Sequence, residues 1–583
     1  MAGLFLVRTR DRGFADSALE SARAQFAAHG FAECTELARP DWVLLHAPPI
    51  LGGPEALLVA GDDLVAVAGT PSWDGRIGRP ALEALLRSAS LPRPDWSRLG
   101  GQFVALVRKG GRSFLLTDYF AAFQLFHDAE MRLFSTSLLT AASALPRLSF
   151  DAQGVYELAF NVVPVGDDTI FSELKTLGPY RIVELTEEGA VAHSIEKPLP
   201  ESVASMPLAE RLARHRASLS QIVRPHVARF GDEIRCALSG GLDSRLVLAA
   251  LRAEGCRPRA FVYGGAGSTD VRVARAIGEG EGLAVEWRDK EAFRSLTPDE
   301  FPEQVARNFE EYDGLPNFGE LFENGGNAAA RDARHAGGAL SVSGGCGEVY
   351  RNFFYLPDRR IRAAAGARTF FARDAAGDAT GKFDERAFLG AIEDKILTAL
   401  GRPGDRSRLP RATVEQVYPR IRCRSLFGRE ISLESRYGPY LMPFLDHRLV
   451  AEAVQLPLAL KNAGRFEARL LADLDPALAA YPSAYGHDFS GPPDLKHRFG
   501  EWTTRVRPIA LRQRSYALRR RLGPLADEHG GLLSREYLGR VIDLEFPVMR
   551  RFFDVDRIGD SGLMRRIANL EYLAARFGSR LVD

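Results

Sequence analysis

The feature that most constrains the fold is a turn rich in serine and glycine at residues 239–244, which read SGGLDS. Residues 234–238 (IRCAL) predict a short buried strand before this turn, and residues 245–254 predict a helix after it. The succession continues with a strand, a helix and a third strand that ends in another glycine turn, at residues 260–263, 270–281 and 339–343. This alternation of strand, turn and helix predicts a parallel α/β sheet.

The composition of the turn suits an anion. Glycines let the backbone turn tightly, so that amide groups and the N-terminus of the next helix face one ligand. Asp243 adds a carboxylate for a magnesium ion. A glycine turn that only caps a helix is the alternative interpretation, and the match of all six residues in a strand–turn–helix setting argues against it. The turn resembles the pyrophosphate-binding loop SGGxDS of ATP pyrophosphatases, which implies pyrophosphate contacts for Ser239, Gly240, Gly241 and Ser244.

Two further segments resemble the nucleotide site of asparagine synthetase and its relatives. Residues 261–264 (FVYG) are similar to the strand and turn that hold adenine in that family, which implies adenine contacts for Val262 and Tyr263. Residues 443–446 (PFLD) are similar to its PFLD segment, and they follow in the expected order.

The second glycine loop of that family is also matched, by residues 343–348 (SGGCGE). The resemblance implies nucleotide contacts for Gly344 and Gly345. It also implies that Glu348 shares the magnesium ion with Asp243. Glutamate is a departure from the aspartate of many relatives, although a longer acid still ligates a hard cation.

The first 200 residues have a different character. Short β-rich runs with helical periodicity between them predict an α+β layered domain; the runs are residues 57–67, 103–108, 113–117 and 132–136, and the helices 16–29 and 79–89. A proline-containing stretch at 196–207 separates this domain from a helical segment that begins near residue 208. From residue 383 onward the chain is predicted to be mainly helical.

Motifs in the first domain resemble the N-terminal nucleophile glutaminase domain of asparagine synthetase, namely GQF at 101–103, Asp118 with LF at 125–126, and FSTS at 134–137. The resemblance therefore implies two domains. Residues 1–200 would form an α+β N-terminal nucleophile-hydrolase-like domain, and residues 208–583 an α/β ATP-pyrophosphatase domain, like adenine nucleotide alpha hydrolases, with a helical C-terminal part. The first domain is expected to be degenerate. Glutamine hydrolysis needs a cysteine at position 2, where this chain has Ala2, and the nearest cysteine is Cys34.

Loss of the nucleophile is shared by β-lactam synthetases and lasso-peptide cyclases, which resemble asparagine synthetase but use an amine of the substrate. The resemblance implies an ATP- and Mg²⁺-dependent ligase that adenylates a carboxylate before an amine attacks. We expect a lasso-peptide macrolactam cyclase, which joins the N-terminal amine of a peptide to an Asp or Glu side chain. The alternatives are β-lactam-type or ammonia-dependent chemistry on a small acid, and a degenerate module that binds nucleotide or peptide without turnover.

Two residues are candidates for catalysis of the amide-forming step. The family places a lysine before an FSxG-like segment, but residues 481–491 (YPSAYGHDFSG) contain none. Lys496 lies five residues further on and is the candidate to replace it; a solvated surface lysine is the alternative. Tyr355 is the candidate to help deprotonate the amine, and packing of its aromatic neighbours is the alternative.

Composition narrows the partners. Lys+Arg (76) and Asp+Glu (75) nearly cancel, which argues against nucleic acid as the main partner and, with the lack of paired cysteines, against a tRNA-modifying ATP pyrophosphatase. No run approaches the roughly 20 apolar residues of a membrane helix, and the five cysteines are scattered. We therefore expect a cytoplasmic enzyme acting on a peptide or small carboxylate. A leader-peptide-binding protein and a protease are the partners that a lasso cyclase would use. The arginine-rich residues 505–521 either contact an acidic partner or form the solvated face of a helix.

Overall fold

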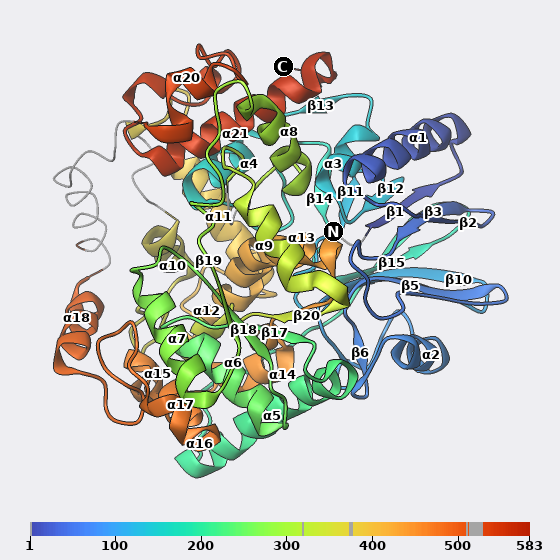
Figure 1. Ribbon diagram of the computed structural model, residues 1–583. Coiled ribbons are helices and arrows are strands. Elements are labelled where there is room, and N and C mark those ends of the chain that lie inside the picture. Colours follow the sequence, from blue (N-terminus) through green and yellow to red (C-terminus); the bar gives the residue numbers. More distant parts are fainter. Residues whose placement is uncertain (1–2, 317–319, 372–376, 509–510, 512–528, 583) are drawn as a thin grey trace.

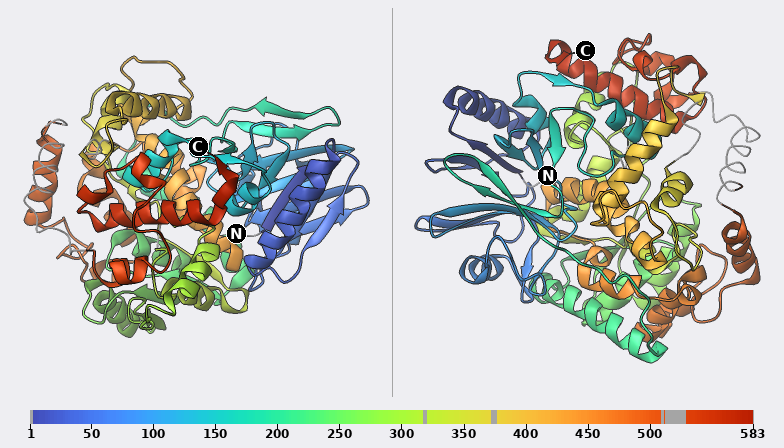
Figure 2. Two further views of the ribbon diagram at one scale, coloured as in Figure 1. Left: turned by 90° about the horizontal axis from the view of Figure 1, so that it is seen from above. Right: turned by 180° about the vertical axis from the view of Figure 1, so that it is seen from behind.

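A computed structural model describes residues 3–316, 320–371, 377–508, 511 and 529–582 (Figure 1). Figure 2 shows antiparallel sheets from the first 200 residues gathered on one side and the helical C-terminal half on the other. Ala2 and most of the arginine-rich segment, residues 509–510 and 512–521, lie outside the described residues. Within the described ranges, none of the helices combines the length and hydrophobicity needed to cross a lipid bilayer.

Two six-stranded antiparallel sheets form the centre of the N-terminal part. The first has the order β14 (Leu174–Thr176), β11 (Phe126–Asp128), β12 (Leu133–Ser135), β1 (Gly3–Arg8), β3 (Trp42–Ala47), β2 (Thr35–Ala38). The second has the order β16 (Ala190–Ser194), β15 (Arg181–Leu185), β10 (Arg112–Thr117), β9 (Phe103–Lys109), β5 (Asp63–Gly69), β4 (Leu57–Ala60). Helices α1 (Arg12–Ala28) and α3 (Leu138–Ser143) contact the first sheet, and α2 (Arg79–Ser88) contacts the second.

The alternation of side chains along β5 explains this layering. Leu64, Ala66 and Ala68 belong to the main core of the molecule, whereas Val65 and Val67 belong to a separate core with α2 residues. Successive strand residues point to opposite faces, so β5 is buried on both sides. The sequence prediction of an α+β layered domain agrees with this arrangement.

Two predicted boundaries in this part were wrong. The run at residues 57–67 is two strands, β4 and β5, because Gly61 with φ +67° turns the chain between them. The helix predicted from residue 16 begins at Arg12, since the Asp11 side chain accepts a hydrogen bond from the Phe14 amide at 3.1 Å and caps its N-terminus.

The C-terminal part contains a five-stranded parallel sheet, which confirms the predicted strand–turn–helix alternation. Its order is β19 (Val285–Arg288), β18 (Arg259–Tyr263), β17 (Ile234–Ala237), β20 (Leu340–Val342), β21 (Tyr440–Leu441). Helices α5 (Leu208–Phe230), α6 (Leu242–Ala253) and α7 (Thr269–Glu281) belong to this part. From β17 the chain proceeds outward to β18 and β19, and it then returns to the other side of β17 for β20 and β21. The strand order therefore reverses between β17 and β20.

The remaining chain is mainly helical, as expected. The longer elements are α8 (Phe301–Glu311), α9 (Gly326–His335), α11 (Glu385–Ala399), α13 (Gly428–Tyr437), α14 (His447–Val454), α16 (Arg465–Leu474), α18 (Leu495–Val506) and α21 (Ser561–Phe577). Helix α21 packs on α4 (Ala152–Asn161), and β22 (Leu581–Val582) pairs in parallel with β13 (Leu148–Ser149). The last residues thus return to the N-terminal part.

Candidate active site

The two glycine loops meet at the point where the strand order reverses. Residues 239–244 follow β17, and residues 343–348 follow β20, its parallel neighbour. In open parallel sheets, ligands bind in the crevice outside the carboxyl ends of the strands at such a point. The loops touch: a Cβ on Gly344 would lie 2.8 Å from the Ser244 amide nitrogen, so only glycine fits there without a shift.

Hydrogen bonds fix the shape of the first turn. The Ser239 amide donates to Ser244 Oγ at 3.0 Å, and the two hydroxyl oxygens are 3.0 Å apart. The Gly240 amide donates to Asp270 Oδ1 at 2.7 Å, and the Gly241 amide to Ser239 Oγ at 3.2 Å. Helix α6 starts directly after Gly241, and no side chain caps it. Since the first amides of a helix have no partner within it, this N-terminus is suited to an anion.

The residues predicted to hold adenine lie on β18, next to β17. Val262 is buried in the sheet, while Tyr263 ends the strand and is half-buried. The Tyr263 hydroxyl accepts a hydrogen bond from Arg334 Nη1 at 2.8 Å, and the Lys290 ammonium lies 4.4 Å from its ring centroid. Burial raises the pKa of the Tyr263 hydroxyl, and Arg334 opposes the shift. Tyr263 therefore has two fixed cationic partners, Arg334 of α9 and Lys290.

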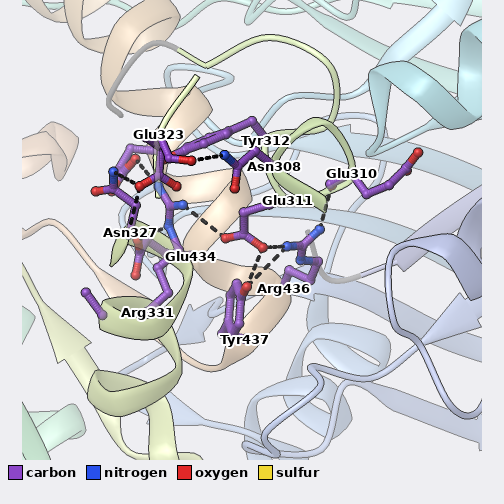
Figure 3. Close-up of polar contacts among 12 residues, drawn as sticks. Asn308, Glu310, Glu311, Tyr312, Glu323, Asn327, Arg331, Glu434, Arg436 and Tyr437 are labelled. Atoms are coloured by element: carbon purple, nitrogen blue, oxygen red, sulfur yellow. Dashed lines mark hydrogen bonds and ion pairs between the residues drawn. The ribbon is translucent and has the colours of Figure 1, made fainter. Parts of the chain in front are cut away.

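Arg334 also pairs with Glu434 and so connects Tyr263 to a large buried ion-pair network. Figure 3 shows the part of this network around Arg331 and Glu311. Arg331 bridges Glu311 at 3.0 Å and Glu434 at 2.8 Å, and so joins α8, α9 and α13. Arg436 and Tyr437 complete the network on Glu311. Removing one partner of a buried pair is strongly destabilising. We interpret this network as structural support for the parallel sheet, because it joins α8, α9 and α13 to one another and, through Arg334, to the end of β18.

The second glycine loop places Glu348 in the short helical turn Gly347–Tyr350. Glu348 accepts a hydrogen bond from the Tyr418 hydroxyl, which orients its carboxylate. Gly345 packs closely under Met442 and Phe427, so that a Cβ would lie 3.1 Å from each side chain. The role of Gly345 in this structure is thus close packing of the loop.

Arg351 was missed by the sequence analysis. Its guanidinium group forms ion pairs with Asp243 and, at 3.1 Å, with Glu467 of α16. Glu467 is completely buried, and burial raises the pKa of its carboxyl group while Arg351 opposes the shift. Glu467 comes more than a hundred residues after Arg351. No local motif marks the pair; only the fold brings it together.

The donor set suits a magnesium ion that also has a phosphate ligand. Among the residues that the structure describes, no group of three or more His, Cys, Asp and Glu side chains could hold a metal ion alone. Asp243 and Glu348 supply carboxylate oxygens, and Mg²⁺ is usually held by one or two carboxylates, waters and substrate phosphates. Arg351 pairs with Oδ1 of Asp243, so this carboxylate already has a cationic partner in the structure. The residues present therefore fit the ion only when a phosphate group completes the site.

A cavity of about 1510 Å³ opens beside this site. Its lining includes Leu242 of the first turn, Glu348 of the second loop and Arg351 just after it. Both predicted catalytic residues, Tyr355 and Lys496, also line it. Tyr355 adopts a left-handed backbone conformation with φ +51°. Lys496 lies exposed in the first turn of α18. The two residues therefore line one cavity, and their catalytic roles stay predictions.

The segment that lacks the expected lysine, residues 481–491, lies directly on the turn at residues 239–244. The Ala484 amide donates to the Gly240 carbonyl at 2.9 Å. Arg245 of α6 donates to the carbonyls of Tyr481, at 2.8 Å, and Pro482, and its guanidinium lies 4.9 Å from the Phe489 ring centroid. Arg245 is completely buried. No local sequence pattern marks this arginine as the anchor of the segment, because its partners are backbone carbonyls.

Comparisons with known proteins add little at the level of sequence: no protein-family model matches the chain, and no curated protein matches it. Two solved structures are similar to it at 10% identity with a TM-score of 0.22. One is the allosteric regulatory enzyme of purine biosynthesis, over 51% of this chain and 67% of that one. The other is glutamine phosphoribosylpyrophosphate amidotransferase from B. subtilis complexed with ADP and GMP, over 51% and 69%.

Proposed function

We propose that this chain is an ATP- and Mg²⁺-dependent ligase that forms an amide bond through an acyl-adenylate. The observation that carries the proposal is the meeting of two glycine loops at the strand-order reversal, where Ser239 and Ser244 are hydrogen-bonded to each other beside the uncapped start of α6. Asp243 and Glu348 would hold the magnesium ion. When bound, that ion would neutralise charge on the pyrophosphate leaving group.

The chain's own residues would position the phosphates. The serine hydroxyls and first amides of α6 would donate hydrogen bonds to pyrophosphate oxygens. Arg351 carries a permanent charge beside Asp243, so it balances this carboxylate in the absence of nucleotide and can turn to a phosphate oxygen when nucleotide is bound. Val262 and Tyr263 would border the adenine.

The size of the cavity favours a peptide as the carboxylate substrate. Pockets for drug-sized ligands typically measure roughly 300–1,000 Å³, and this cavity, at about 1510 Å³, exceeds that range. The proposed reaction is therefore macrolactam closure of a peptide, as in lasso-peptide cyclases. An N-terminal amine would attack the adenylated side chain of Asp or Glu.

Pyrophosphate exchange tests the proposal. The purified chain is incubated with ATP, Mg²⁺, labelled pyrophosphate and a panel of linear Asp- or Glu-containing peptides, small amino acids and sugar acids. Label entering ATP only with peptides supports peptide adenylation, and label entering with a small acid moves the substrate to that class. No exchange with any acid, together with tight ATP binding, would identify a binding module in place of a ligase.

A further inference from the structure

Two histidines line the cavity beside the turn at residues 239–244, which we call the phosphate turn because of its proposed function. The proposed reaction assigns them no role so far. His487 lies in the segment that covers Gly240, and His497 lies in α18, which forms another wall of the same cavity. Their ring centroids are 5.4 Å apart. The Tyr485 ring lies 6.2 Å from the first and 5.5 Å from the second. The three rings form one cluster on the cavity wall.

The position of His487 is fixed with respect to the phosphate turn. Ser483 Oγ donates to the His487 carbonyl and accepts from the Tyr485 amide at 3.1 Å, which closes the loop between them. Ala484 holds this loop on Gly240, as described above. Backbone hydrogen bonds to the phosphate turn hold His487 at a fixed distance from the proposed site of the reacting carboxyl group. Proton transfer requires such a fixed position.

The His487 imidazole is available as a proton acceptor. Its Nδ1 atom is shielded from solvent and has no hydrogen-bond partner among the described residues. Buried polar atoms are normally paired, so an unpaired imidazole nitrogen on a cavity wall indicates a partner supplied by the ligand or by the other histidine. Neutral imidazole offers one acceptor nitrogen, which can take up a proton.

Charged groups around the cluster favour the neutral form of His497. Burial lowers the pKa of the His497 imidazole most. The positive charges of His487 and Arg351 lower it further, while Asp494 opposes the shift. Asp488 follows His487 in the loop, and Lys496 precedes His497 in the helix. Arg351 is charged at every accessible pH, so it disfavours a second positive charge in this wall and promotes onward release of the proton.

We propose that His487 is the catalytic base of amide formation, with His497 as the second proton acceptor; this assignment rests on the proposed ligase function. The neutral amine attacks the carbonyl carbon of the acyl-adenylate, and a C–N bond forms. The C–O bond to the AMP phosphate breaks, and its electron pair leaves with AMP. The proton lost by the amine nitrogen passes to His487, then to His497 and to water.

His487→Asn tests the assignment, because asparagine fits the loop but does not accept a proton. Two steps are measured with a peptide that supports exchange in the unmodified enzyme: ATP–pyrophosphate exchange, and single-turnover formation of the amide by mass spectrometry. We expect unchanged exchange and amide formation slowed by about 100-fold or more at neutral pH. Added imidazole and higher pH should restore part of the rate, because each supplies deprotonated amine without His487. Hydroxylamine, which is largely neutral at pH 7, should still trap the adenylate.

Two controls separate a base from a structural role. His193→Asn replaces a histidine of β16 that pairs with Glu184 of β15 at 2.8 Å, in the second antiparallel sheet of the N-terminal part. This variant should change neither step. His497→Asn should slow amide formation less than His487→Asn. The assignment would be overturned if His487→Asn formed the amide at the unmodified rate. It would also be overturned if the variant lost both pyrophosphate exchange and amide formation. Absence of exchange in the unmodified enzyme with every acid would instead refute the ligase function.

Discussion

Asp243 faces two cations in the proposed cycle, the Arg351 guanidinium and a magnesium ion. Asp243→Asn keeps a hydrogen-bond acceptor for Arg351 but removes the negative charge that a divalent cation needs. We expect ATP–pyrophosphate exchange to fall to background while the urea midpoint of unfolding stays unchanged. Asp232→Asn, at an exposed turn, is the matched control. Normal exchange in Asp243→Asn would show that this carboxylate is not a metal ligand.

Lys496 is the residue for which sequence and structure allow the clearest test of a catalytic role. Its side chain is exposed at the cavity, so Lys496→Ala should change the free energy of unfolding by less than about 0.5 kcal/mol. If the ammonium group stabilises charge as the amide forms, the variant retains exchange and loses amide product. An unchanged product yield, measured by mass spectrometry over the same time course, would remove Lys496 from the mechanism.

At the scale of elements, helix α5 carries two histidines that the fold keeps neutral. Burial lowers the pKa of His215 to about 3 and that of His226 to about 4. His215 lies 3.3 Å from the Tyr350 hydroxyl, with its ring against Phe466, and Arg211 and Lys461 add to its shift. In the unfolded chain these two histidines take up protons at the usual histidine pKa of about 6.5, while in the folded chain they stay neutral until the pH is far lower. The stability that the two neutral histidines contribute is therefore fully present above a pH of about 6.5, and it is lost as the pH falls from about 6.5 towards 4.

The expected loss between about pH 7 and pH 5.5 is about 1 kcal/mol for each histidine. Urea unfolding followed by circular dichroism at both pH values measures it. His215→Asn and His226→Asn together should reduce the pH dependence, whatever they do to stability at neutral pH. An equally steep dependence in the double variant would show that other buried groups cause it.

The elements also show what a sequence can predict here. Strand β17, the turn at 239–244 and helix α6 were predictable, because a short strand-forming run, glycines and helical periodicity are all local signals. Arg245 looked like an ordinary residue of that helix, yet it is buried and holds the segment around Pro482. Its role depends on backbone carbonyls that lie more than two hundred residues away. Contacts of this kind carry no local pattern.

At the scale of the whole molecule, the two parts share one core. Residues of the first sheet, such as Phe5, and of the parallel sheet, such as Leu340, belong to the same continuous cluster of buried side chains. Gln102 joins the parts by exchanging hydrogen bonds with the backbone of Met442, at 3.2 and 3.3 Å. Interfaces between independent domains are usually more polar and smaller. A chain built in this way should unfold as one unit.

Gly428 tests this unity, because α13 begins there in direct contact with the N-terminal part. A Cβ at this position would overlap the Ala122 carbonyl oxygen, so Gly428→Ala must push the two parts away from each other although alanine favours helix. We expect a single calorimetric transition for the unmodified chain, and a loss of about 1–3 kcal/mol for Gly428→Ala. Gly390→Ala in α11, where a Cβ meets open space, is the matched control and should be neutral or stabilising. Two separate transitions in the unmodified chain, with only one of them lowered by Gly428→Ala, would show that the parts fold independently and that the shared core does not couple them.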